Sequence, residues 1–197
     1  MTSYTIPHPS SLNLAQAHQR IPEPLQLTNL IFLDIDGVLN SDRSFIAFSD
    51  QTIYRIDLNV EAVKTIDPVS VGLLNNLIKK SHAKIVVSSS HRKFFKNDIE
   101  MQELKLYISR LGVTGTVIGM TPDIPNAPRG KEIRAWIESW CEKGNNVGRY
   151  LILDDSPDIL EDQQENFVRT CVSNGFLTEH YYKACKILGV QVGASND

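Results

Sequence analysis

From residue 29 onward the chain alternates short apolar runs with longer amphipathic segments. Each apolar run is continuous, which is typical of strands covered on both faces, and ends at polar residues. The longer segments repeat their apolar residues at helical spacing, and several of them end at a glycine. The pattern predicts strands over residues 29–35, 83–90, 115–120, 149–156 and 166–172, and helices over residues 71–80, 99–112, 129–144 and 177–189.

Strands separated by helix-length segments pair in parallel, because each connection has to cross over the sheet. We therefore predict an α/β fold with an open, mainly parallel five-stranded sheet between helices. Residues 29–197 are expected to form one domain, and the proline-containing residues 1–28 a flexible N-terminal arm. In such sheets ligands bind outside the carboxyl ends of the strands, so these ends are where functional residues are expected.

Composition narrows the classes of function without choosing one. The net charge of −3, from 23 acidic and 20 basic residues, gives no global attraction to nucleic acid or to anionic membranes. The three cysteines, Cys141, Cys171 and Cys185, lack metal-ligand spacing and are expected to be buried thiols in a reducing compartment. The sequence has neither a membrane-length apolar run nor a secretory signal, so the expected location is cytoplasmic.

Three of the predicted strands end in residues that suit phosphate chemistry. The first ends in Asp34 and Asp36, the second in serines 88–90, and the fourth in Asp154 and Asp155. Clustered carboxylates repel one another unless a positive group lies among them, and Mg²⁺ with oxygen ligands is a natural neutraliser. A single aspartate at a strand end is usually a turn residue or a helix cap, whereas this combination favours catalysis. A calcium loop is disfavoured, because the residues that follow lack its ligand spacing.

These residues resemble the motifs of a known superfamily. The stretch "LDIDGVLNS" resembles motif one of the haloacid dehalogenase (HAD) superfamily of phosphotransferases, and "VVSSS", "RGK" and "LILDDS" match motifs two, three and four in order. Over about residues 29–189 the chain resembles the small HAD domains associated with RNA-repair proteins. The resemblance implies a Rossmann-like HAD fold and hydrolysis of phosphate esters through an aspartyl-phosphate, with Mg²⁺ as cofactor.

The resemblance also implies a division of roles among the acids. Asp34 is the nucleophile that forms the aspartyl-phosphate, and Asp36 is the general acid and then the base. Residues two apart on a strand share a side, so both carboxylates can face one phosphate. Mg²⁺ would be held by Asp34, by the backbone carbonyl of Asp36 and by a motif-four acid, with Asp155 favoured as that ligand and Asp154 as a second acid near the metal. Members of the superfamily that cleave carbon–halogen bonds lack an acid at the position of Asp36, so its presence favours phosphoester hydrolysis.

The side chains expected to bind the phosphoryl oxygens each carry either a hydroxyl group or a positive charge. The candidates are Ser88, Ser89, Arg92, Arg129 and Lys131. Ser88 comes first after the apolar run, although Ser90 is an alternative, and Arg129 competes with Lys131 for the motif-three role. Relatives usually carry tryptophan where this chain has His91, which is either a tolerated replacement or a contact to the substrate.

The gaps between the motifs are too short for a full cap domain, so we expect a minimal cap or none. Residues 41–68 can form a small flap, with Phe45, Phe48 and Tyr54 as candidate lid aromatics. An open site favours a bulky substrate such as a nucleotide, a polynucleotide end or a protein phosphoresidue. The stretch "HRKFFKND" is interpreted either as a positive rim for a single-stranded nucleic acid end or as a solvated helix start.

The leading prediction is an enzyme, a Mg²⁺-dependent phosphomonoester hydrolase acting on nucleotides or on the phosphate ends of nucleic acids. The alternatives are a phosphatase of proteins or small metabolites and a catalytically silent HAD-like binding module. The intact pair of Asp34 and Asp36 argues against the silent module. No membrane partner is predicted, and the oligomeric state is left open.

Overall fold

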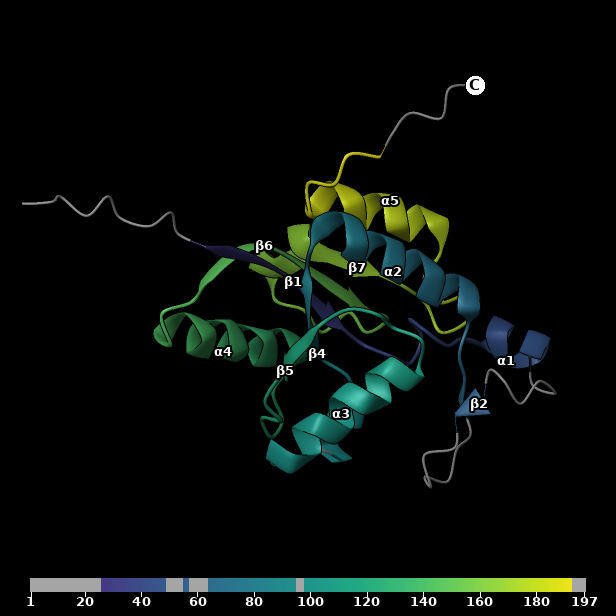
Figure 1. Ribbon diagram of the computed structural model, residues 1–197, viewed down its shortest axis with the longest axis horizontal. Helices are drawn as coiled ribbons and strands as arrows, with labels where there is room; N and C mark the ends of the chain where they lie inside the picture. Colours follow the sequence, from purple (N-terminus) through teal and green to yellow (C-terminus); the bar gives the residue numbers. More distant parts are fainter. Residues whose placement is uncertain (1–25, 49–54, 57–63, 95–97, 193–197) are drawn as a thin grey trace, which may run out of the picture.

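The computed structural model describes residues 26–48, 55–56, 64–94 and 98–192 (Figure 1). Its strands are β1 (Leu27–Leu33), β2 (Arg55–Ile56), β3 (Lys64–Thr65), β4 (Lys84–Val87), β5 (Val117–Met120), β6 (Asn146–Asp154) and β7 (Phe167–Arg169). Its helices are α1 (Asp42–Phe48), α2 (Pro68–Ser81), α3 (Asp98–Arg110), α4 (Arg129–Glu142) and α5 (Thr178–Ile187), together with the 3-10 turns η2 (Ser90–Phe94) and η3 (Glu161–Asn166).

Five strands form one parallel sheet in the order β5-β4-β1-β6-β7. The central strand β1 pairs Leu33 with Val87 of β4 on one side and with Leu153 of β6 on the other. The short strands β2 and β3 form a separate antiparallel pair. The prediction of an α/β fold with a five-stranded parallel sheet between helices is confirmed, and each predicted strand and helix has a counterpart.

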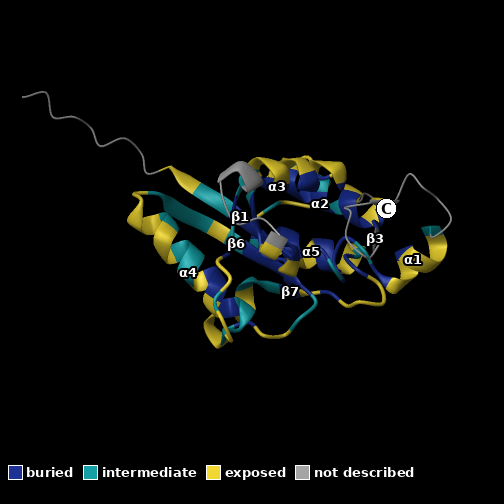
Figure 2. Ribbon diagram, turned by 90° about the horizontal axis from the view of Figure 1, so that it is seen from below, coloured by how far each residue is buried: buried dark blue, intermediate teal, exposed yellow. Residues whose placement is uncertain are grey.

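The strands alternate their side chains between two apolar layers, as the strand period of two requires. Ile31 and Leu33 of β1 belong to the larger layer, to which α2, α3 and α5 contribute. Leu30 and Phe32 belong to the other layer, which they share with Ile133 of α4. Helices α2 and α5 lie side by side (Figure 1), and β1 and β6 become fully buried toward their carboxyl ends (Figure 2).

The strand order reverses at β1. The chain passes from β1 outward to β4 and β5, and then returns to β6 and β7 on the other side of β1. Loops that leave the carboxyl ends of neighbouring strands diverge at such a switch point, and ligands bind in the crevice between them. Asp34 follows β1 and Asp154 ends β6, so the topology brings these two acids together at this point.

The region predicted as a small flap, residues 41–68, contains α1 and the β2–β3 pair. Neither element was specified by the sequence pattern, because both are too short to show a clear period. Of the candidate lid aromatics, Phe45 is exposed and Phe48 is half-buried, while Tyr54 lies outside the described residues.

The remaining expectations have mixed outcomes. The arm predicted over residues 1–28 lies outside the described residues as far as residue 25, and its last two residues begin β1. Cys185 is buried as expected, but the prediction is wrong for Cys141 and Cys171, which are exposed. Cys141 lies in the last turn of α4, whose buried residues are near the helix start, and Cys171 lies in the loop after β7. Within the described part of the chain, no helix has the length and apolar character needed to cross a membrane.

Candidate active site

Asp34 directly follows β1 and is buried. Its backbone N–H donates to the carbonyl of Leu153 (2.9 Å), so the ladder to β6 continues past the end of the strand. Its Oδ1 accepts a hydrogen bond from the backbone N–H of Ile35 (2.7 Å), and the Ser89 hydroxyl also bonds to this side chain. The backbone ladder and these two hydrogen bonds therefore hold the carboxylate that the sequence predicts as the nucleophile.

Three carboxylates gather at the carboxyl ends of β1 and β6. One ligand oxygen from each of Asp34, Asp154 and Asp155 lies within 4.8 Å of the other two. Asp154 is buried, and its Oδ2 accepts no hydrogen bond from the described residues, although Arg129 Nε lies 3.1 Å away as an ion-pair partner. A buried carboxylate oxygen without a hydrogen bond is costly, and a hard cation with oxygen ligands would satisfy it. The donor set therefore fits a divalent cation such as Mg²⁺.

Gly37 makes room for Asp155 beside the buried acids. Its φ of +68° lies in the left-handed region that favours glycine, and a Cβ there would stand 2.6 Å from Asp155 Oδ2. Its carbonyl accepts a hydrogen bond from the Thr170 hydroxyl (2.7 Å), which anchors the loop after β1 to the end of β7. The absence of a side chain at Gly37 thus lets the Asp155 carboxylate lie against the backbone.

Burial controls the protonation of the buried acids. Burial, and next the charge of Asp34, raise the pKa of Asp154 to about 7, although the Arg129 guanidinium opposes the rise. Burial also raises the pKa of Asp34, against the effects of Arg129 and of the hydrogen bonds to the carboxylate. A cation among the carboxylates would favour their charged forms, so the raised pKa values are consistent with a metal-binding cluster.

Arg129, the first residue of α4, reaches the acid cluster. Its Nε lies 3.1 Å from Asp154 Oδ2, and its Nη2 lies 3.9 Å from Asp34 Oδ2. Lys131 is exposed and forms no ion pair with the described residues. Residues two apart point to different sides of a helix, so Arg129 and Lys131 cannot both face the acids. The geometry brings Arg129, the competing candidate for motif three, to Asp34 and Asp154.

Asp36 is held in the turn that follows Asp34. Its Oδ1 accepts a hydrogen bond from Asn40 Nδ2 (2.8 Å), and Asn40 Oδ1 accepts in turn from the Gly37 N–H (3.0 Å). Its Oδ2 lies 3.0 Å from His91 Nε2. The Asp36 side chain is 38% exposed, whereas that of Asp34 is 9% exposed. This accessible position suits a group that exchanges protons with a substrate or with water.

The serines after β4 occupy different positions. Ser88 and Ser89 are buried, and Ser90 is exposed. The Ser88 hydroxyl accepts a hydrogen bond from Thr121 Oγ1 (3.5 Å), whereas the Ser89 hydroxyl bonds to Asp34. Ser89 is therefore the serine of this run whose side chain contacts Asp34.

Arg92 is paired in the interior. Its side chain is 4% exposed, with Nη2 2.5 Å from Glu132 Oε2 and Nη1 donating to the Ser89 carbonyl (2.8 Å). Burial and then the charge of Arg129 lower the pKa of Arg92, while Glu132 opposes this. These contacts tie the loop after β4 to α4, so Arg92 supports the wall of the site.

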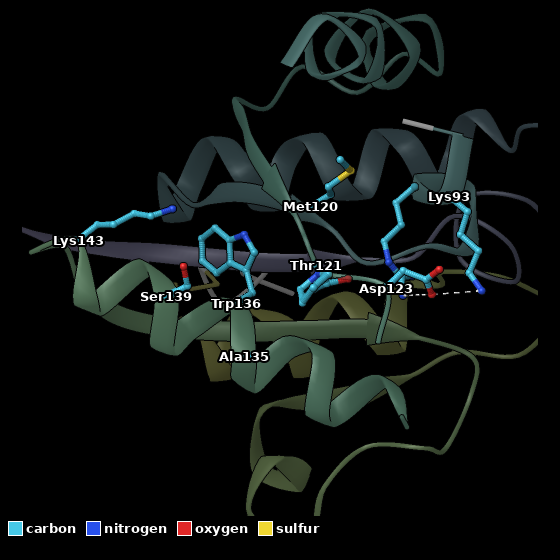
Figure 3. A pocket seen from close by; sticks show the side chains of 10 residues that line it. Lys93, Met120, Thr121, Asp123, Ala135, Trp136, Ser139 and Lys143 are labelled. Atoms are coloured by element: carbon cyan, nitrogen blue, oxygen red, sulfur yellow. Dashed lines mark ion pairs between the residues drawn. The ribbon is translucent and has the colours of Figure 1, made fainter. Parts of the chain in front are cut away.

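Two adjoining cavities lie beside the cluster, along α4. The nearer cavity, of about 370 Å³, has Arg129 in its lining, and the second, of about 610 Å³, extends past Trp136 to Lys143. Arg92, Lys93 and Asp123 line both, so the two cavities adjoin, and we term them together the α4 groove. Figure 3 shows Trp136 between Lys143 at one end and the Lys93–Asp123 ion pair at the other.

The positive rim predicted for residues 91–98 is only partly described. His91 and Arg92 are buried, which removes their side chains from the surface, whereas Lys93 is exposed. Residues 95–97 lie outside the described part of the chain. Arg92 and Lys93 both line the α4 groove, where the exposed Lys93 is paired with Asp123.

Three residues that support the site were not singled out from the sequence: Asn40, Tyr107 and Glu132. Asn40 lies within the first motif, where an amide four residues after Asp36 offered a signal. Tyr107 and Glu132 lie on helices, and the pattern of apolar positions does not mark which polar residues turn inward. Their partners in the site, His91 and Arg92, come from a distant loop.

A comparison with known families gives a match that covers most of the chain. The model of the family described as "HAD domain in Swiss Army Knife RNA repair proteins" matches residues 30–181, which is well over half of the chain. A comparison with curated proteins gave no match.

Proposed function

Because the chain belongs to the family of HAD domains in Swiss Army Knife RNA repair proteins, we propose that it is a Mg²⁺-dependent phosphomonoester hydrolase with nucleic acid phosphate ends as substrates. The family supports a phosphatase-type role for this chain. The cofactor, the substrate and the roles of individual residues are the content of the proposal.

One observation carries the proposal above the others. Asp34, Asp154 and Asp155 bring ligand oxygens within 4.8 Å of one another, and the Arg129 guanidinium lies against two of these acids. A structural ion pair needs one acid for one base, whereas here three carboxylates lie together and a single guanidinium pairs with two of them. Such an excess of acids fits a site that binds a cation together with a phosphoryl group.

In the first step, an Asp34 oxygen attacks phosphorus and the bond from phosphorus to the leaving oxygen breaks. Asp36 gives its proton to that oxygen, which departs as an alcohol and leaves an aspartyl-phosphate on Asp34. Arg129 and the Ser89 hydroxyl lie at the nucleophile, where they can stabilise the charge that develops on the equatorial phosphoryl oxygens. The geometry favours Arg129 over Lys131 for this work.

In the second step, water attacks the phosphorus of the aspartyl-phosphate while Asp36 takes its proton. The bond from phosphorus to Asp34 breaks, which restores the carboxylate and releases inorganic phosphate. Mg²⁺ held by Asp34, Asp155, the Asp36 carbonyl and the neighbouring Asp154 would neutralise charge among the acids and the phosphoryl oxygens. Burial of Asp34 excludes bulk water from the nucleophile.

The α4 groove supports a nucleic acid end as the substrate. It begins at Arg129, beside the nucleophile, and continues past an aromatic ring at Trp136 to a cation at Lys143. An aromatic side chain between basic residues is a common arrangement in sites that hold single strands. A terminal phosphate placed at Asp34 would leave the adjoining nucleotides room in this groove.

The test is hydrolysis of p-nitrophenyl phosphate with and without Mg²⁺, comparing wild type with Asp34→Asn. We expect turnover that requires Mg²⁺ and falls by at least about 1,000-fold in the variant, since the variant lacks the nucleophile. Lack of metal-dependent turnover in the wild type would refute the enzymatic proposal.

A second measurement tests the substrate class. The values of kcat/KM are compared for mononucleotides, for oligonucleotides phosphorylated at the 3′ or the 5′ end, and for phosphopeptides. We expect the oligonucleotides to be preferred. A preference for phosphopeptides would contradict the nucleic acid proposal while leaving the phosphatase chemistry intact.

A further inference from the structure

His91 lies in η2, directly after β4, and contacts the residue proposed as the general acid. Its Nε2 is 3.0 Å from Asp36 Oδ2, and its Nδ1 is 2.7 Å from the Tyr107 hydroxyl. The imidazole is 8% exposed, and its ring stacks on that of Tyr107 with centroids 5.8 Å apart and planes 16° apart. Both ring nitrogens of a buried histidine are thereby engaged, one of them by a carboxylate of the site.

Tyr107 fixes the imidazole from the side away from Asp36. It lies on α3 and is buried, and burial followed by the charges of Asp36 and Asp34 raises the pKa of its hydroxyl. The group therefore remains a neutral hydroxyl, able to donate or to accept a hydrogen bond with His91 Nδ1. Stacking and this hydrogen bond together set the direction of Nε2.

The two oxygens of Asp36 are held from different parts of the chain. Asn40, four residues later in the same turn, bonds Oδ1, and His91, from the loop after β4, contacts Oδ2. A carboxylate held at one oxygen can still rotate about its Cβ–Cγ bond, whereas two partners in different directions fix its plane. Proton transfer to a leaving group requires hydrogen-bonding reach, and a displacement of about 1 Å can cost about 100-fold in rate.

We propose that His91 is a positioning residue. Tyr107 holds the His91 imidazole by a hydrogen bond, and the imidazole in turn orients the Asp36 carboxyl toward the leaving-group oxygen. The inference rests on the proposed function and deepens it. It assigns His91 to neither of the roles considered from the sequence, a tolerated replacement or a substrate contact, because its ring nitrogens face Asp36 and Tyr107.

The experiment compares two leaving groups. p-Nitrophenolate departs readily without a proton, whereas the alkoxide of a ribonucleoside needs one. The value of kcat/KM includes every step up to the departure of the leaving group, so it reports on this proton transfer. We expect His91→Ala to lower kcat/KM about 10-fold to 100-fold for a ribonucleoside 3′-monophosphate and by less than about threefold for p-nitrophenyl phosphate. His91→Gln, which retains a side-chain N–H donor, should recover part of the loss. Tyr107→Phe should lower kcat/KM for the ribonucleoside 3′-monophosphate by less than His91→Ala does.

A double-mutant cycle separates positioning from folding. In an Asp36→Ala background, His91→Ala should cause no further loss with the ribonucleoside monophosphate, because the group that it orients is gone. Equal losses on the two substrates, or a full additional loss in the Asp36→Ala background, would overturn the inference. Wild-type protein that hydrolyses neither substrate would instead overturn the proposed function, so the two failures are distinguishable.

Discussion

Arg129 Nε lies 3.1 Å from the buried Oδ2 of Asp154. This pair links the first turn of α4 to the end of β6, and the same guanidinium reaches within 3.9 Å of Asp34. Under the proposed mechanism, the Arg129 guanidinium is held by Asp154 and can stabilise a phosphoryl group on Asp34 without first moving.

The first prediction separates the two candidates for motif three. Arg129→Ala should lower kcat/KM for p-nitrophenyl phosphate by about 100-fold or more, because it removes charge stabilisation at the nucleophile. The matched control is Lys131→Ala on the same helix, which should change kcat/KM by no more than about twofold, as expected for an exposed side chain. Steady-state kinetics check both, and a larger loss in Lys131→Ala would reverse the assignment.

The second prediction concerns the pH dependence of stability in the metal-free protein. The pKa of Asp154 is raised to about 7 from an ordinary value of 3.8. Between about pH 4 and about pH 7 the folded protein therefore binds more protons than the unfolded chain, so this group lowers stability as pH rises through that window. Above about pH 7 the loss is complete and constant.

Asp154→Asn removes the penalty while keeping the shape of the side chain. Thermal unfolding in a chelator should give a higher Tm for the variant than for wild type at about pH 8, and little difference at about pH 4. Added Mg²⁺ should raise the Tm of wild type at the higher pH and have a smaller effect on the variant. A lower Tm for Asp154→Asn at about pH 8 in chelator would contradict the prediction.

The third prediction compares two ion pairs of the same length. Arg92 and Glu132 are buried and 2.5 Å apart, while Arg134 and Asp162 are exposed and also 2.5 Å apart. Glu132→Gln should lower the free energy of unfolding by about 3–5 kcal/mol, because it removes the nearest charge partner of a buried guanidinium. Asp162→Asn should cost no more than about 1 kcal/mol. Denaturant unfolding measures both, and equal costs would show that burial does not control these pairs.

The fourth prediction uses two glycines with similar backbone angles. Gly37 and Gly144 have φ of +68° and +80°, so alanine at either position should destabilise the fold by about 1–2 kcal/mol. At Gly37 the added Cβ would also displace Asp155, whereas no atom lies within 4 Å of a Cβ at Gly144. Only Gly37→Ala should raise the Mg²⁺ concentration required for half-maximal activity. Identical metal titrations of the two variants would argue against Asp155 as a metal ligand.

The fifth prediction tests the α4 groove. Lys143→Glu should raise KM for a phosphorylated oligonucleotide while leaving p-nitrophenyl phosphate unaffected, because only the longer substrate reaches this end of the groove. Lys186→Glu, in the last turn of α5, makes the same charge change at an exposed position away from the groove. Equal effects of the two substitutions would indicate general electrostatics and not binding along the groove.

The sequence was sufficient to predict the edge of the sheet where the acids meet. Apolar runs identified the strands that deliver Asp34 and Asp154, and parallel pairing placed their carboxyl ends together. The choice between Arg129 and Lys131 required the rotational position of α4, which depends on how Ile133 and its neighbours pack on the sheet. A sequence pattern predicts which face of a helix is apolar more reliably than it predicts where the side chains of the first helical turn point.

The contacts of His91 were beyond prediction for a different reason. Its partners Asp36 and Tyr107 come from the turn after β1 and from α3, and nothing in their spacing along the chain brings the three together. Their meeting depends on where η2 directs its side chains, which is a property of tertiary packing. The same limit applies to Glu132, whose inward orientation follows from its pairing with Arg92.

The central position of β1 has a consequence for synthesis on the ribosome. The pairing of β1 with β4 requires the chain only as far as Val87, but its pairing with β6 joins Leu33 to Leu153 and must wait for most of the chain. A nascent chain therefore carries Asp34 and Ser89 well before Asp154 and Asp155 exist to complete the cluster. Under the proposed function, the site would be complete only once the sheet has closed, so an unfinished chain would not act on phosphate esters.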